Sequence, residues 1–379
     1  YTLRLNGADH VTFRKMTIEA TNTSFGRAID ISGGADQNRF LNNIIRSVNT
    51  ASTSVNLAAV YSSSTAVNTG NQFVQNKIER GSSGLYIEGN STSNPVGWQV
   101  SNNTFSNQYF RGMYLLRLNA PIVANNTLST SSTYSAYVAI LPELCVNQLA
   151  VSANKILAQN ANSTGIWLSS CNGTSAAPCI VSNNFISVAG TANNLYGIIT
   201  ASGNFIQVLH NTVVSQNTNA DSRVFYGQST NNLTVRNNIF YHRGTGFAAT
   251  YDGTSFVSDH NDFFTSGPNL ASGNNYGVAT TLDQWRTISG RDNNSISVNP
   301  QLETAIPFNA HAIELNNAAA PTPLVTTDIN GQSRSATTPD IGAREFAPDP
   351  VDARLVAFNG LTPPLASGNV PVKVVLKNN

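Results

Sequence analysis

Short apolar runs separated by polar stretches recur along most of the chain. The phrases "VSNNTF" at 100–105, "VSNNFI" at 181–186 and "VRNNIF" at 235–240 share the form apolar-x-x-Asn-x-apolar. This form recurs on average about every 27 residues and places its Asn at Asn43, Asn76, Asn103, Asn126, Asn154, Asn184, Asn211, Asn238 and Asn261. One period earlier, "FRKMTI" at 13–18 has Met16 in the Asn position. The sequence therefore predicts at least ten repeats.

Each repeat contains a second apolar run upstream of its Asn, such as "GLYIE" from Gly84 or "GIWLS" from Gly165. These runs alternate polar and apolar residues and are rich in β-branched and aromatic side chains, which is typical of strands, while Gly, Ser, Asn and Thr fill the turns. One such coil cannot bury its apolar edge alone and must stack on its neighbours. The pattern predicts an all-β parallel β-helix, a solenoid of at least ten coils, called rungs below.

The repeated Asn has a structural explanation. Equivalent residues of successive rungs lie about 4.8 Å apart. An Asn at a bend between strands can adopt left-handed backbone angles, and inward Asn side chains can pass amide hydrogen bonds from rung to rung. We therefore interpret the nine Asn residues as an internal ladder and not as catalytic groups.

Composition limits the partners. Charged residues make up 11% of the chain and the formal net charge is +1. There is no basic stripe for nucleic acid, and no apolar run of the length needed for a membrane span. The expected partners are a polysaccharide or cell-surface glycan and further domains of the same protein.

Domain boundaries follow from changes in pattern. We assign residues 1–279 to the rungs and residues 280–346 to a C-terminal cap. A Pro- and Asp-rich linker at 347–353 leads to 354–379, which alternates like the start of an immunoglobulin-like β-sandwich but is too short to complete one. Because the chain begins in repeat-like sequence, we expect part of the β-helix to lie upstream.

The predicted cap contains two features. "TTLDQWRTISGRDNNS" predicts a short helix, with Thr280 or Thr281 as its N-cap and Leu282, Trp285 and Ile288 at helical spacing, so Trp285 is expected to pack. Downstream, opposite charges gather at Asp328, Arg334, Asp340 and Glu345. They predict a salt-bridged cover over strand edges. No cofactor is predicted; a calcium site is the alternative, although the spacing does not match an EF-hand loop.

The succession "FVSDHNDFF", "TLDQWRTISGRDNNSISVNPQL" and "DINGQSRSATTPDIGAREF" resembles the C-terminal signature of right-handed parallel β-helix proteins of the pectin-lyase-like class. The form is that of large secreted surface proteins of gliding and polymer-degrading Gram-negative bacteria. The resemblance covers about residues 1–346 and implies the fold, but lyases, hydrolases and adhesins share this signature. The tail "VPVKVVLKNN" is similar to the first strands of adhesion-type immunoglobulin-like modules. Such proteins are commonly exported by the type IX pathway, which implies an extracellular, cell-surface location.

An enzyme is one functional hypothesis, as a polysaccharide lyase or glycoside hydrolase. The Asn-Thr-Asp, Asp-Asp, Gly-His-Gly and Arg-Ile-Lys motifs of polygalacturonase-like hydrolases are absent. A lyase needs charge neutralisation and a base on one outer sheet, and the charged residues here do not form a column. Asp259, His260 and Asp262 are the best local candidates for acid/base chemistry, yet they occupy a corner phrase where polar residues are expected anyway.

A rigid adhesin segment that binds glycans is the hypothesis we favour. Aligning the upstream strands places Tyr61, Tyr86, Tyr114 and Trp167 in one register, and alternation turns them outward. As a glycan-binding column they should have ring faces open to solvent, with no acidic cluster and neighbouring Arg or Lys beside them. The alternative is that these rings only pack on one another or on loops.

Three cysteines leave the pairing open. Cys171 and Cys179 bracket a short loop, whereas Cys145 precedes Cys171 by about one rung. Either pair could lie within bonding distance, and export to an oxidising compartment would favour one disulfide.

Overall fold

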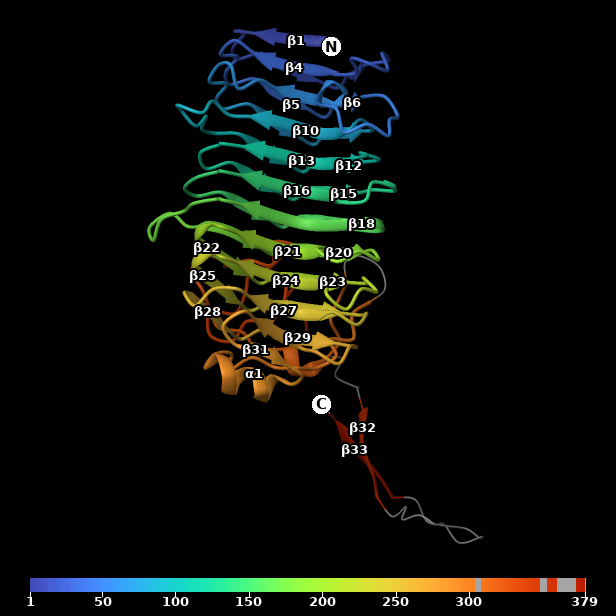
Figure 1. Ribbon diagram of the computed structural model, residues 1–379, viewed down its shortest axis with the longest axis vertical. Helices are drawn as coiled ribbons and strands as arrows, with labels where there is room; N and C mark the ends of the chain where they lie inside the picture. The colour runs from blue at the N-terminus through green and yellow to red at the C-terminus, as the bar shows by residue number, and fades with distance from the viewer. Residues whose placement is uncertain (304–307, 348–352, 360–372, 379) are drawn as a thin grey trace, which may run out of the picture.

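The computed structural model describes residues 1–303, 308–347, 353–359 and 373–378. Its strands stack as successive rungs in one elongated solenoid (Figure 1). Ten rungs are complete, and every strand pair between rungs is parallel except at the last turn, where β30 and β31 pair antiparallel. The predicted all-β parallel β-helix is confirmed, and no helix in the described ranges is long and apolar enough to cross a membrane.

Each rung contributes one strand to each of three sheets. The first sheet contains β1 Leu3–Asn6, β4 Ile29–Ser32, β7 Val60–Ser62, β10 Ser83–Glu88, β13 Arg111–Leu116, β16 Tyr137–Glu143, the second half of β18 Lys155–Ser169, β21 Tyr196–Ala201, β24 Arg223–Gln228, β27 Phe247–Tyr251, β30 Ala271–Gly273 and β31 Gly277–Ala279. The second sheet contains β2 Thr12–Arg14, β5 Arg39–Leu41, β8 Gln72–Val74, β11 Gln99–Ser101, β14 Ile122–Ala124, β17 Ala150–Ser152, β19 Cys179–Ser182, β22 Asn204–Leu209, β25 Asn231–Arg236 and β28 Phe256–Asp259. The third sheet contains β3 Thr17–Glu19, β6 Ile44–Arg46, β9 Lys77–Glu79, β12 Thr104–Ser106, β15 Thr127–Ser129, the first half of β18, β20 Phe185–Ala189, β23 Thr212–Ser215, β26 Ile239–His242 and β29 Asp262–Thr265.

The core is built from columns of equivalent side chains. In the second sheet Phe13, Phe40 and Phe73 are in register, and the rings of Phe40 and Phe73 stack with their centroids 4.6 Å apart. Such stacked pairs bury large apolar area and add a favourable ring contact. Because each rung repeats the alternation, one continuous apolar core runs the length of the solenoid.

The nine repeated Asn residues form one internal column. Each side-chain amide from Asn43 to Asn238 donates to the Oδ1 atom of the Asn in the next rung, at 2.9–3.1 Å. That same Oδ1 atom also accepts the preceding Asn's backbone N–H. The column ends where the Asn261 backbone N–H donates to the Ser295 hydroxyl at 2.9 Å. All nine side chains are buried, so the ladder satisfies groups that would otherwise be costly inside the core.

The left-handed bend lies one residue earlier than the ladder. We expected the Asn of the ladder to adopt the left-handed conformation, but in every rung the residue before it does so. These residues have φ between 52° and 63° and are Lys15, Asn42, Gln75, Asn102, Asn125, Ala153, Asn183, His210, Asn237 and His260. Their side chains consequently point away from the core column.

A helix closes the end of the solenoid. It is α1, Leu282–Ser289, with the Thr281 side chain accepting from the backbone of Gln284 and with Gly290 in the left-handed conformation (φ 68°) after its last turn. Figure 1 shows α1 across the end of the last rungs. Trp285 is fully buried against Tyr251 and donates its indole N–H to Asp292 at 2.8 Å. The expected short helix and the packing role of Trp285 agree with this arrangement.

Residues 296–303 and 308–346 do not cover strand edges; most of them run back along the side of the solenoid. We call this segment the strap. It includes the short 3-10 turn Ile313–Leu315, and its apolar residues pack on the outward side chains of the third sheet, including Phe185, Val214 and Ile239. Asn183 and Asn237, both left-handed bend residues, hydrogen-bond its backbone.

The charged residues predicted for the cap belong to the strap. Arg334 pairs with Glu345 and also donates to the Asn183 side chain and the Gly342 carbonyl. Asp328 and Asp340 accept backbone N–H groups of the strap itself. The expected salt-bridged cover therefore exists, but over a side face of the rungs.

The last described elements are β32, Ala353–Asn359, and β33, Lys373–Asn378, which pair antiparallel. Two strands alone do not establish the expected immunoglobulin-like module, and residues 360–372 between them lie outside the described ranges.

Candidate ligand-binding surface

The aromatic residues singled out in the sequence lie on the outer face of the first sheet. Tyr61, Tyr86 and Tyr114 are in register on three successive rungs. Further along, Trp167 pairs with Ile199, which pairs with Tyr226. Asp30 occupies the same position in the rung before Tyr61. The strands therefore bring these side chains into one outward column, called here the aromatic column.

The three tyrosine rings on successive rungs of the aromatic column contact one another. Ring centroids are 6.0 Å apart for Tyr61 and Tyr86, and 4.7 Å apart for Tyr86 and Tyr114. Tyr61, Tyr86 and Trp167 stay partly exposed, whereas Tyr114 is only 7% exposed. The ring faces are thus more covered than the glycan hypothesis expected, because rungs 4.8 Å apart leave little space between successive rings.

Arginine and carboxylate groups flank three of the tyrosines. Arg27 lies over the ring of Tyr61 at 3.6 Å, and the Tyr61 hydroxyl donates to Glu88 of the next rung at 3.1 Å. The same arrangement recurs as Arg111, Tyr114 and Glu143, and as Arg223, Tyr226 and Asp252. Cation–π contacts of this kind stabilise a ring and a guanidinium together. The expected absence of charged neighbours therefore does not hold.

The electrostatics keep these hydroxyls protonated. Burial and the neighbouring Glu88 carboxylate raise the pKa of Tyr61 to about 12. Burial and Glu143 raise the pKa of Tyr114 further. Burial also lowers the pKa of the Arg111 guanidinium, which remains a cation near pH 7. At neutral pH the face therefore offers neutral rings bordered by Arg and carboxylate groups of both signs.

Asp259, His260 and Asp262 do not converge on a reaction site. Asp259 contacts His260 at 3.1 Å and also accepts two hydrogen bonds from Asn294. Asp262 is fully buried and accepts the backbone N–H of Val298, and burial raises the pKa of its carboxyl well above the ordinary range. Its side chain lies under the strap, where a polymer cannot reach it.

All three cysteines are buried as free thiols. Cys145 and Cys171 occupy adjacent rungs, since the Asn172 N–H that follows Cys171 donates to the Cys145 carbonyl at 2.9 Å. Burial raises the pKa of the Cys179 thiol to about 12. Neither pairing considered from the sequence is present as a disulfide.

Sequence reasoning missed a groove on the second sheet. Gln207 and Thr234 form part of its floor, and residues of the turn before Cys179 form part of its wall. The length of that turn is visible in the sequence. Whether a long turn forms the wall of a groove depends on where the strands of the neighbouring rungs end.

Ten parallel coils with three sheets, a continuous core and an internal Asn ladder define a parallel β-helix protein, consistent with the right-handed pectin-lyase-like class. The chain belongs to the family described as periplasmic copper-binding protein (NosD), whose match covers residues 20–223. The family description names a periplasmic protein, and periplasmic proteins are exported from the cytoplasm. A comparison with curated proteins finds none that matches the chain.

The copper in the family description can be tested against the side chains. Protein copper sites use Cys, His and Met donors that converge on one point. In the part of the chain that the structure describes, no group of three or more His, Cys, Asp or Glu side chains is arranged to hold a metal ion. The three thiols each lie against a backbone carbonyl, and the imidazole of His242 bonds to Ser222 and Gly244. The described residues do not fit a copper site.

Proposed function

We propose that this chain is a rigid exported β-helix segment that binds a polysaccharide along the outer face of the first sheet. The observation that carries the proposal is the aromatic column, which places Tyr61, Tyr86 and Trp167 partly exposed on a straight, repeating face. An extended ligand suits such a face because each rung presents an equivalent position.

The surroundings of the aromatic column support a binding role. The strap covers part of the third sheet and α1 covers the end of the core. By contrast, the hydrophobic side chains that pack around the column all come from the first sheet itself. Among them, the rings of Tyr86 and Trp167 stay partly exposed and are available to a ligand on this face.

The chemistry favours a sugar chain over an apolar partner. Tyrosine and tryptophan offer apolar ring surface together with polar groups, which suits the apolar faces and hydroxyls of sugars. The Arg and carboxylate groups beside the rings add donors and acceptors, and their charges balance locally, as in the 2.8 Å pair of Arg27 and Asp30. As part of a cell-surface adhesin, the solenoid would also act as a stiff spacer, since its core runs unbroken along its length.

The test uses the Tyr86→Ala/Trp167→Ala variant, which removes two partly exposed rings and keeps the buried Tyr114. Affinity electrophoresis against a panel of neutral and acidic polysaccharides should show retardation of the wild type. We expect at least tenfold weaker binding for the double variant, since truncating a central aromatic contact commonly costs upward of about 1 kcal/mol. Ile122→Ala is the control, because it removes an exposed apolar side chain from the second sheet.

Two results would overturn the proposal. The first is equal retardation of the wild type and the double variant. The second is the release of unsaturated or new reducing ends from the polymer, abolished by Asp259→Asn or His260→Gln, because that would establish an enzyme.

A further inference from the structure

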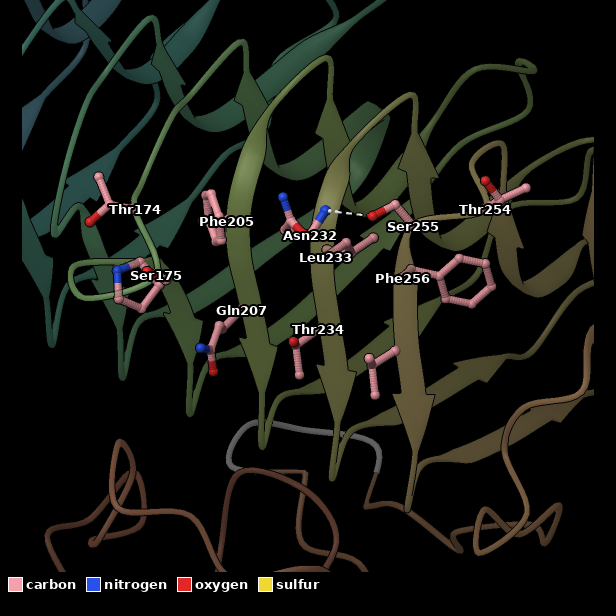
Figure 2. Close-up of a pocket in the computed structure, with 12 residues that line it drawn as sticks. Thr174, Ser175, Phe205, Gln207, Asn232, Leu233, Thr234, Thr254, Ser255 and Phe256 are labelled. Atoms are coloured by element: carbon pink, nitrogen blue, oxygen red, sulfur yellow. Dashed lines mark hydrogen bonds between the residues drawn. The ribbon is translucent and has the colours of Figure 1, made fainter.

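A groove lies on the outer face of the second sheet, away from the aromatic column. Its volume is about 420 Å³, within the range of small-molecule sites. The floor comes from β22, β25 and β28, and one wall comes from the turn between β18 and β19. Figure 2 shows Gln207 and Thr234 on neighbouring strands of the floor, with Thr174 and Ser175 on the wall.

The groove exists because turn length differs between rungs. Residues 170–178 separate β18 from β19, whereas only residues 202–203 separate β21 from β22, and 229–230 separate β24 from β25. In the next rung the turn lengthens again to residues 252–255. Two short turns therefore lie between two longer ones. Because rungs are about 4.8 Å apart, the longer turns stand roughly 14 Å apart along the solenoid.

The longer wall is preformed. Thr174 and Ala177 exchange backbone hydrogen bonds at 3.0 and 3.2 Å, and the Gly173 N–H donates to the Asn204 carbonyl at 2.9 Å. A side chain at Gly173 would meet the backbone of Cys179 and Phe205 at 2.7 Å. The turn is thus held tightly against the floor, so ligand binding would cost little conformational entropy in this turn.

The floor carries unused polar groups. Gln207 and Thr234 project outward, since their neighbours Ile206, Val208 and Leu233 are buried. Neither side chain has a hydrogen-bond partner among the described residues. Asn232 donates its amide to Asn204 at 2.9 Å, which leaves its Oδ1 atom available to accept. Three hydrogen-bonding groups are therefore free on adjacent strands.

The rest of the lining is apolar or hydroxylated, and none of the twelve lining side chains is charged. Phe205 contributes an aromatic surface, and Val257 is 47% exposed. The nearby Arg291 donates to three backbone carbonyls, of Phe256, Ser289 and Thr254. Its hydrogen-bond donors are thus occupied within the protein, and no lining side chain offers a cation to an acidic ligand.

We infer that this groove binds a short neutral oligosaccharide that lies across the rungs. The free amide and hydroxyl groups match sugar hydroxyls, and Phe205 and Val257 match the apolar face of a sugar ring. An acidic sugar would lose hydration without gaining a counter-charge from the lining side chains, which is unfavourable. This site is separate from the aromatic column and does not depend on it.

The experiment measures binding of neutral cellotetraose, xylotetraose, mannotetraose and maltotetraose, and of acidic tetragalacturonate, to the full chain by saturation-transfer NMR and calorimetry. We expect at least one neutral tetrasaccharide to bind and the acidic one not to bind. Gln207→Ala/Thr234→Ala should weaken that binding about tenfold or more, since each change removes a direct hydrogen bond. Circular dichroism and thermal unfolding confirm that each variant is folded.

Gln72→Ala is the matched control. Gln72 occupies the same outward column of the second sheet, five rungs before Gln207, so its loss should leave binding unchanged. Tyr86→Ala/Trp167→Ala should also leave it unchanged, which separates this site from the aromatic column. Absence of binding to every neutral probe, equal binding of tetragalacturonate, or unchanged affinity in the Gln207→Ala/Thr234→Ala variant would each overturn the inference.

Discussion

At the residue scale, one side chain in each rung joins three rungs. The Asn184 amide donates to Asn211 Oδ1 at 2.9 Å and to the Val151 carbonyl of the preceding rung, also at 2.9 Å. Its own Oδ1 atom accepts two donors from Asn154. The repeated phrase was sufficient to place this column, because identical spacing in a stacked fold puts identical residues above one another. It did not reveal the left-handed bend one residue earlier, where residues as different as Lys15 and Ala153 serve equally.

Replacing Asn184 by Ala should lower the free energy of unfolding by about 1–3 kcal/mol, because Asn154 and Asn211 keep buried polar groups that lose their partners. Denaturant unfolding followed by circular dichroism gives the value. Asn193→Ala, in an exposed turn, should change stability by less than about 0.5 kcal/mol. Equal effects of the two changes would contradict the ladder's energetic role.

A second prediction concerns His242, which is buried with Gly244 donating to Nδ1 at 3.0 Å and with Ser222 at Nε2. Burial lowers its pKa to about 4, against about 6.5 in an unfolded chain. Between these values the unfolded state binds more protons. The contribution of His242 to the free energy of unfolding is therefore complete above pH 6.5. It is lost as pH falls toward 4, by up to about 3 kcal/mol.

The measurement compares the pH dependence of unfolding free energy in wild type and His242→Gln. The variant should lose less stability than the wild type between pH 6.5 and 4. His311→Gln removes an exposed histidine and should keep the wild-type slope. Parallel curves for wild type and His242→Gln would show that the imidazole is not held neutral.

At the element scale, strands and helix were predictable because each carries its own local signal. Alternating apolar residues mark the strands, and Thr281, Leu282 and Trp285 mark the start and buried face of α1. Ile288 was expected on the same face but is 39% exposed, because the short helix meets the core mainly through Leu282 and Trp285. The groove could not be predicted, since it arises from the relative lengths of turns in different rungs.

Trp285→Ala should destabilise the protein by about 3–5 kcal/mol, since it opens a cavity against Tyr251 and leaves Asp292 without its indole donor. Thermal and denaturant unfolding measure the loss. Ile288→Ala on the same helix should cost under about 1 kcal/mol. A small effect of Trp285→Ala would mean that the end of the core is closed by something other than α1.

At the scale of the whole molecule, the strap ties the C-terminal part of the chain to rungs far earlier in sequence. Arg334 reaches Asn183 at 2.7 Å, and the Ala343 N–H donates to the Thr212 hydroxyl at 3.0 Å. The charged residues of the strap were visible in the sequence, but the position of the strap on the solenoid was not. The apolar residues of the strap do not recur at a fixed spacing. The surface on which they pack is the outer face of rungs whose other outward side chains are polar.

Arg334→Met should release the strap, because Glu345 is left buried without its cation, a change that commonly costs about 3–5 kcal/mol. Hydrogen exchange should become faster at the amides of Ala320 and Ala343 while the ladder amides stay protected. Arg39→Met, on an exposed strand position, should leave exchange unchanged. Equal acceleration along the whole solenoid would argue against the strap as a separate cooperative unit.

The Asn ladder also has a direction. Every side-chain amide from Asn43 to Asn238 gives one hydrogen bond to the Asn of the next rung on the C-terminal side, and at Asn261 the backbone N–H donates to the Ser295 hydroxyl in place of another Asn. A solenoid assembled from its N-terminal side would therefore always carry two unmet ladder donors at its advancing tip, the side-chain amide and the backbone N–H of its last Asn, and the Oδ1 atom of the next coil accepts both. Each added coil therefore presents the same donors to the next coil, and Ser295 ends the series. The number of rungs in such a fold is set by the position of this last acceptor, so rungs can be inserted or removed upstream without changing the residues at the end.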